Sequence, residues 1–194
     1  MLPLASRDNP ISMTVNEPHW LTADHHPEAP SDPLYDWLTN QGSLTQRLTI
    51  AGRGDFAVEL LCQTQAPARA DEAAALGVPA SSPLWIREVL LWAAGQPRVF
   101  ARSAATPASV AAAGLALDEL GNRSLGELLF SHPDIQRGPL EISRYPANWL
   151  PVGQQEPDCW ARRSLFQRAG LQLLVCEVFL SAWQPLVTPS PSTL

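Results

Sequence analysis

Several segments of the chain alternate apolar and polar residues, a pattern in which successive side chains point to opposite faces of a β-strand. Two pairs of these segments are separated by short turn sequences, Gly95-Gln96-Pro97 and Ala169-Gly170, which predict two β-hairpins. We predict strands over residues 56–63, 84–92, 98–106, 140–145, 160–168 and 172–182.

Helix signals lie between the predicted strands. Ser43 and Ser124 are suitable helix N-caps, and the sequence Ser124-Leu125-Gly126-Glu127 matches a capping box. We predict short helices from Asp32-Pro33 to Trp37, after Ser43, over 108–120 and from Ser124 to Phe130, with one helical turn inside the loop 66–83. Hairpins with intervening helices and no repeated βαβ unit predict an α+β fold, a single antiparallel β-sheet with helices packed on it.

The two ends of the chain differ in composition from its middle. Residues 1–31 contain five prolines among polar residues, and residues 188–194 are rich in Pro, Ser and Thr. We therefore predict two flexible ends around one folded domain over 32–187. Three histidines in the first segment have no acidic or cysteine ligands spaced around them, so we predict no metal site there.

Composition and charge narrow the class of function. The net charge of −6 disfavours a general nucleic-acid surface, and no apolar stretch approaches the roughly 20 residues that span a bilayer. The chain also lacks a recognisable secretory signal, a Walker loop, a G-x-G-x-x-G turn and an H-E-x-x-H motif. Its three cysteines fit neither a disulfide framework nor zinc spacing. These features predict a cytoplasmic protein with a small partner and no cofactor.

Two charged residues interrupt strands that are otherwise strongly apolar. Period 2 places Arg87 on one face with Trp85 and Val89, and Glu177 on one face with Val175. These faces could be exposed to solvent, or the two charges could pair with each other or with neighbours such as Glu88. Alternatively, the faces line a dry pocket in which the arginine binds a carboxylate in a two-pronged contact.

Ten segments, taken together, carry a resemblance to a known family. They are Asp36-Trp37-Leu38, 43–48, 85–91, 95–97, 101–107, 117–121, Ser124-Leu125-Gly126, Leu129-Phe130, 160–164 and 173–180. In the same order, across about residues 34–186, they resemble the chorismate lyase (chorismate pyruvate-lyase) family. Leu44 stands where the family pattern has methionine, and Ala161 where it has glycine.

The resemblance implies a monomer whose helical flaps cover an enclosed ligand site. It implies a cofactor-free carbon–oxygen lyase of ubiquinone biosynthesis, which converts chorismate to 4-hydroxybenzoate and pyruvate and retains its product. Arg87 would bind the ring carboxylate with the backbone of Leu125, Glu177 would meet the ring hydroxyl, and Leu44 would cover the ring, with Arg102 in a supporting role. The alternative is a non-catalytic sensing domain, since effector domains of some bacterial repressors are similar in fold.

Overall fold

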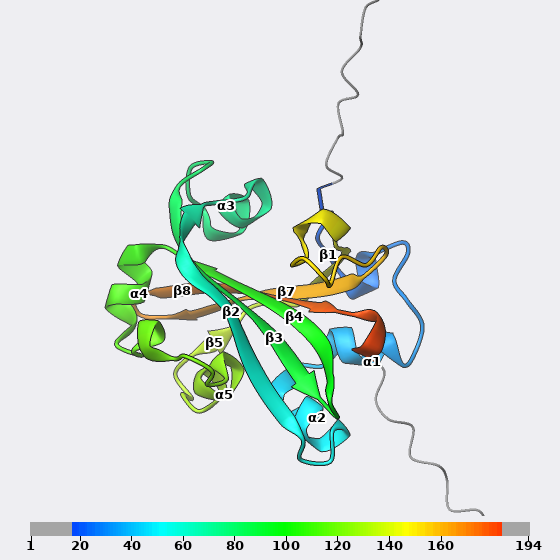
Figure 1. Cartoon of the computed structure of the whole chain (residues 1–194). Helices are drawn as coiled ribbons and strands as arrows, with labels where there is room; N and C mark the ends of the chain where they lie inside the picture. The colour runs from blue at the N-terminus through cyan, green and yellow to red at the C-terminus, as the bar shows by residue number, and fades with distance from the viewer. Residues whose placement is uncertain (1–16, 184–194) are drawn as a thin grey trace, which may run out of the picture.

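One antiparallel sheet organises the molecule. The computed structural model describes residues 17–183, and its eight-stranded sheet has the order β1-β6-β7-β8-β4-β3-β2, with β5 paired to β7 (Figure 1). The strands are β1 (Leu21–Thr22), β2 (Phe56–Pro67), β3 (Pro83–Ala93), β4 (Gln96–Ala105), β5 (Gln136–Arg137), β6 (Glu141–Arg144), β7 (Trp160–Arg168) and β8 (Leu171–Phe179).

Short helices lie on both faces of this sheet. The helix α3 lies on one face, whereas α1, α2 and α5 lie on the other (Figure 1). The α-helices are α1 (Leu34–Thr39), α2 (Leu44–Ala51), α3 (Ala70–Leu76), α4 (Pro107–Ala113) and α5 (Leu125–Phe130). The 3₁₀ helices are η1 (Ala23–His25), η2 (Leu117–Glu119), η3 (Ala147–Trp149) and η4 (Ser181–Trp183). The α+β class predicted from the sequence is confirmed.

Both predicted hairpins form, as β3–β4 and β7–β8. The predicted helix over 108–120 is wrong in its second half, because Gly114 ends α4 in the left-handed conformation (φ 62°) and the separate turn η2 follows. Asp32 does not cap α1, which begins at Leu34 without a side-chain hydrogen bond to its first turn.

The N-terminal boundary predicted at residue 32 lies too far along the chain. Leu21 and Thr22 form β1, which pairs with Ile142 and Glu141 of β6, and the ring of His26 lies 4.9 Å from that of Trp160. A strand of two residues is too short to show an alternating pattern, so β1 could not be predicted from periodicity. The predicted tail 188–194 lies outside the described residues. Within residues 17–183, no helix is long and apolar enough to cross a membrane.

Candidate active site

A cavity lies between one face of the sheet and the helices α2 and α5. Its walls are mostly apolar, and on the sheet side they come from β2, β3, β4, β5, β7 and β8. Its polar or charged lining residues include Arg87, Ser103, Arg137, Arg162 and Glu177. An apolar cavity with few convergent polar groups has the composition of a small-molecule site.

The strand register explains why Arg87 and Glu177 share this cavity. Arg87 of β3 lies opposite Ser103 of β4, while Glu177 of β8 lies opposite Ala101, two residues earlier on β4. From strand spacing and rise, the two Cα atoms are about 12 Å apart. The two charges therefore lie at separate ends of one cavity, and the predicted alternative of an Arg87–Glu177 ion pair is wrong.

Arg87 is a buried cation without a carboxylate partner among the described residues. Its side chain is only 2% exposed, and its Nη2 donates to the backbone oxygens of Gly121 and Arg123, at 2.9 Å each. Its buried Nε has no hydrogen-bond partner within the described chain. Burial lowers the pKa of Arg87 from its ordinary value of 12.5, but an arginine side chain stays protonated in proteins. The group can therefore donate to an incoming anion.

Glu177 is anchored at the other end by a second arginine. Arg162 donates from Nε to Glu177 Oε2 at 2.6 Å, and its Nη1 donates to the backbone oxygens of Trp37 and Asn40. The nearest nitrogen of Arg137, Nη2, lies 3.9 Å from the same Oε2. The Glu177 side chain is 14% exposed, so one oriented carboxylate can face a ligand in the cavity.

Two leucines close the cavity from the helix side. Leu44 and Leu125 are the first residues of α2 and α5, and both are buried. The sequence predicted both helix starts correctly, because Ser43 and Ser124 accept hydrogen bonds from amides of the first turns. The backbone amide at the start of such a helix has no partner within the helix, so Leu125 can offer an N–H to an anion.

A hydrogen bond joins the two covering helices. The hydroxyls of Thr45 on α2 and Ser124, the N-cap of α5, lie 2.7 Å apart. Gly126 permits this approach, since a Cβ at that position would meet Thr45 Oγ1 at 3.1 Å. The bond connects the α2 side of the cavity to the α5 side.

Arg102 does not line the cavity, contrary to its predicted supporting role. Its neighbours Ala101 and Ser103 face the cavity, so alternation along β4 points Arg102 to the opposite face. There it donates to Glu72 at 2.6 Å and to Glu88 at 2.7 Å. Burial alone would lower the pKa of Arg102, but the hydrogen bonds and charges of these carboxylates raise it.

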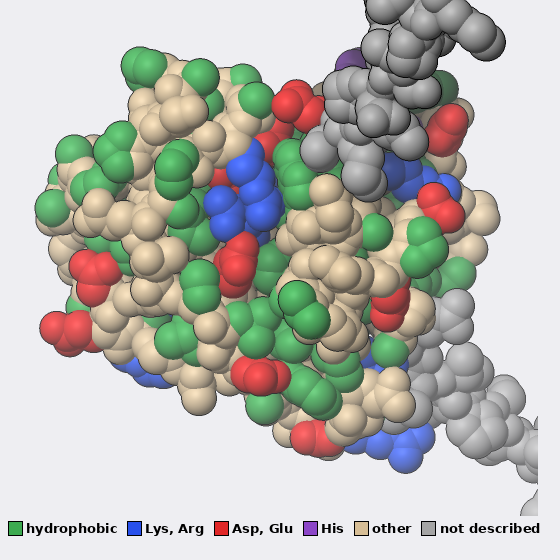
Figure 2. All heavy atoms as spheres, turned by 45° about the horizontal axis from the view of Figure 1, so that its top comes forward, with side chains coloured by type: hydrophobic (Ala, Val, Ile, Leu, Met, Phe, Trp, Pro, Cys, Tyr) green, Lys and Arg blue, Asp and Glu red, His purple; other side chains and the backbone are tan. Residues whose placement is uncertain are grey.

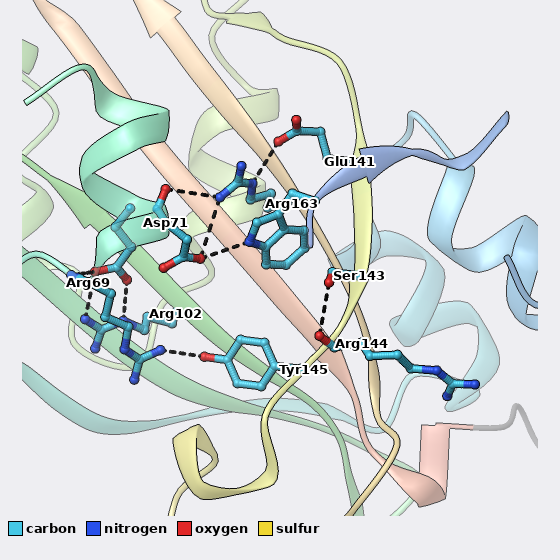
Figure 3. Close-up of polar contacts among 10 residues, drawn as sticks. Arg69, Asp71, Arg102, Glu141, Ser143, Arg144, Tyr145 and Arg163 are labelled. Carbon is cyan, nitrogen blue, oxygen red and sulfur yellow. Dashed lines mark hydrogen bonds and ion pairs between the residues drawn. The ribbon is translucent and has the colours of Figure 1, made fainter. Parts of the chain in front are cut away.

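The face of the sheet that carries α3 holds a network of paired charges. Figure 3 shows Arg102 near Arg69, which donates to the hydroxyl of Tyr145 at 2.7 Å. It also shows Arg163 between Asp71 and Glu141. Basic side chains with acidic ones directly beside them are visible on this face in Figure 2. This network holds α3 against the sheet through Arg102 of β4 and Arg163 of β7.

Sequence reasoning missed Arg137 and Arg162. Arg162 carried a usable signal, because it is a charge within the strand 160–168, as Arg87 is within 84–92. Arg137 lies in the two-residue strand β5, which has no periodicity to place it.

Together, the fold and the cavity define an α+β ligand-binding domain in which helices close a site against one face of a sheet. Comparison with known proteins gives the family. The model of the family "Chorismate lyase" matches residues 14–187. The chain therefore belongs to the chorismate lyase family.

Relatives described as "Probable chorismate pyruvate-lyase" are similar over most of this chain. The protein of Pseudomonas syringae pv. syringae (strain B728a) is 47% identical over 165 residues, covering 85% of this chain and 89% of the relative. That of Pseudomonas putida (strain KT2440) is 50% identical over 153 residues, covering 78% and 83%.

Solved structures with a similar fold have much lower identity. The effector domain of PhnF from Mycobacterium smegmatis has a TM-score of 0.50 at 15% identity and covers 73% of this chain and 90% of its own. Another structure of PhnF from the same organism has a TM-score of 0.51 at 14% identity and covers 79% and 70%. These likenesses concern the fold alone.

Proposed function

We propose that this chain is a chorismate pyruvate-lyase, which converts chorismate to 4-hydroxybenzoate and pyruvate. One observation carries the proposal. Arg87, which is buried without a carboxylate partner among the described residues, and Glu177, which is held by Arg162, lie at opposite ends of an apolar cavity. Membership of the chorismate lyase family and similarity to relatives described as probable chorismate pyruvate-lyases support it.

The ring of chorismate carries a carboxylate at one end and a hydroxyl at the other, beside an enolpyruvyl ether. Arg87 binds the ring carboxylate through its unpartnered Nε, assisted by the amide of Leu125. Glu177 accepts a hydrogen bond from the ring hydroxyl, and Leu44 covers the ring. These contacts fix the substrate at both ends.

In the reaction the ether carbon–oxygen bond breaks and its electron pair leaves with the enolpyruvyl oxygen. The hydrogen on the carbon that bears the hydroxyl is lost as a proton, and its electron pair completes the aromatic ring. A proton added to the methylene carbon of the enolpyruvate gives pyruvate. Aromatisation supplies the driving force, so the protein orients the substrate, excludes water and stabilises the departing charge. We propose that no cofactor takes part.

Retention of the product follows from the same contacts. The anchors that bind the ring carboxylate and the hydroxyl also fit 4-hydroxybenzoate, and the covering helices are joined by the Thr45–Ser124 hydrogen bond. Opening of these helices therefore limits turnover, and a pre-steady-state burst of product is expected. A role in ubiquinone biosynthesis and a monomeric state remain predictions from the family resemblance, and a cytoplasmic location remains a prediction from the sequence features.

The first experiment is to mix the protein with chorismate, without metal or nucleotide, and to measure 4-hydroxybenzoate by chromatography and pyruvate by a coupled assay. Equal amounts of both are expected. Arg87→Met and Glu177→Ala should lose turnover, whereas Arg168→Met, an arginine outside this cavity, should keep it. Binding of 4-hydroxybenzoate without any turnover of chorismate would favour the sensing-domain alternative. Full activity in Glu177→Ala would refute the role of Glu177.

A further inference from the structure

Arg137 is one of three arginines within residues 17–183 that line the cavity, and the contacts described above give it no function. It lines the cavity from β5, and its side chain is only 11% exposed. Its Nε donates to the hydroxyl of Ser164 at 2.7 Å and its Nη1 to the backbone oxygen of Gln41 at 3.2 Å. The rings of Phe166 and Phe130 lie 5.3 and 5.9 Å from its guanidinium carbon.

One nitrogen of Arg137 is incompletely used. Nη2 makes no hydrogen bond within residues 17–183, and the Glu177 oxygen 3.9 Å away is too distant to accept one. Burial lowers the pKa of Arg137 to about 10, although the charge of Glu177 acts to raise it. The group is therefore a buried cation whose charge is only partly compensated, and a second anion beside Glu177 would complete its contacts.

Arg162 differs from Arg137 because it already binds a carboxylate directly. Its Nε donates to Glu177, and its Nη1 donates to two backbone oxygens. Its task is to hold Glu177 in place. Arg87, the remaining lining arginine, lies at the other end of the cavity. Among the lining residues that the structure describes, three arginines face one carboxylate, a net charge of +2.

This charge matches a dianion better than a monoanion. Chorismate carries two carboxylates, one on the ring and one on the enolpyruvyl group, whereas 4-hydroxybenzoate carries one. The enolpyruvyl ether is attached to the ring carbon next to the one that bears the hydroxyl. A ligand whose hydroxyl meets Glu177 therefore places its second carboxylate close to Glu177, on the side where Arg137 lies.

We infer that Arg137 binds the enolpyruvyl carboxylate of the substrate and is a substrate-binding residue specific to chorismate over the product. The inference rests on the proposed function. When the ether bond breaks, its electron pair moves to the enolpyruvyl oxygen, next to this carboxylate, and the cation stabilises the added negative charge. Arg137 then loses its carboxylate when pyruvate leaves, while Arg87 keeps that of the ring.

The test compares substrate and product on the same variants. In Arg137→Met, kcat/KM for chorismate should fall on the order of 10- to 100-fold, the effect of removing a charge-assisted hydrogen bond to a carboxylate. The Kd of 4-hydroxybenzoate, measured by titration calorimetry, should change by no more than about twofold, because the product lacks the second carboxylate. Arg137→Lys should lose less activity than Arg137→Met, since lysine keeps the positive charge but lacks the two parallel N–H donors of a guanidinium.

Two controls separate this role from others. Arg87→Met should weaken both ligands, and Arg168→Met, which removes an arginine paired with Asp134 away from the cavity, should weaken neither. Equal weakening of chorismate and 4-hydroxybenzoate by Arg137→Met would show that Arg137 only supports the loop at Gln41, and unchanged kinetics would also overturn the inference. If the unsubstituted protein releases no pyruvate from chorismate, the proposed function itself has failed.

Discussion

The hydrogen bond between Thr45 and Ser124 should set the rate at which the cavity opens. Thr45→Val removes the hydroxyl and keeps the β-branched shape, so the helix propensity of α2 is nearly unchanged. Ser124→Ala is a poorer probe, because Ser124 also caps α5. A neutral hydrogen bond contributes about 1 kcal/mol net. Loss of this 2.7 Å contact should therefore shift the closed–open equilibrium about fivefold toward open.

The assay is dissociation of 4-hydroxybenzoate from the preloaded protein after rapid dilution, followed by stopped-flow fluorescence. We expect a dissociation rate about two- to tenfold higher in Thr45→Val, with kcat rising by a similar factor if release limits turnover. Thr49→Val is the matched control. Its hydroxyl donates to a backbone oxygen of the same helix, Thr45 O. An unchanged dissociation rate in Thr45→Val, or the same increase in Thr49→Val, would refute the reasoning.

Three further predictions concern other parts of the chain. Gly126→Ala should also speed product dissociation, measured in the same way, because the new Cβ would lie 3.1 Å from Thr45 Oγ1 and force the helices apart. The hydrogen bonds and charge of Arg102 outweigh burial and keep the pKa of Glu72 below its ordinary 4.5. The ionised Glu72 carboxylate therefore stabilises the fold fully above about pH 4.5, and this stabilisation is lost as the pH falls through its folded-state pKa. In Glu72→Gln the melting temperature, measured by calorimetry across this range, should fall less steeply with decreasing pH. Burial raises the pKa of all three cysteine thiols, and Cys62 is partly accessible whereas Cys159 and Cys176 are buried. When native protein is treated with iodoacetamide, mass spectra should show modification of Cys62 before either of the others.

Local patterns predicted part of the cavity face. Alternation assigned Arg87 and Glu177 each to one face of an apolar strand but left open whether those faces were exposed or lined a pocket, and each predicted hairpin pairs neighbouring segments of the chain. The serine caps located the starts of α2 and α5, which set Leu44 and Leu125 over the cavity. These features depend on neighbouring residues, so a sequence contains the information needed to find them.

The partners of Glu177 could not be predicted in this way. Arg162 lies opposite Glu177 across the β7–β8 hairpin, but its hydrogen bonds to Trp37 and Asn40 depend on how α1 packs, more than 100 residues away in the chain. Arg137 reaches the cavity from a two-residue strand. Arg102 could not be placed from the sequence either. The β3–β4 register shifts between Leu91 and Trp92, and only after this irregularity does Arg102 lie opposite Glu88 rather than Arg87.

The two faces of the sheet use arginine in opposite ways. On the α3 face Arg102 and Arg163 each contact two carboxylates, so their charges are compensated within the protein. On the cavity face Arg87 has no carboxylate partner among the described residues, and the Arg137 guanidinium lies 3.9 Å from its only one. Burial of uncompensated charge costs free energy that folding alone does not return. In the proposed function a negatively charged ligand would supply the missing partners. The arginines whose burial costs folding free energy would then be the ones that select an anionic substrate.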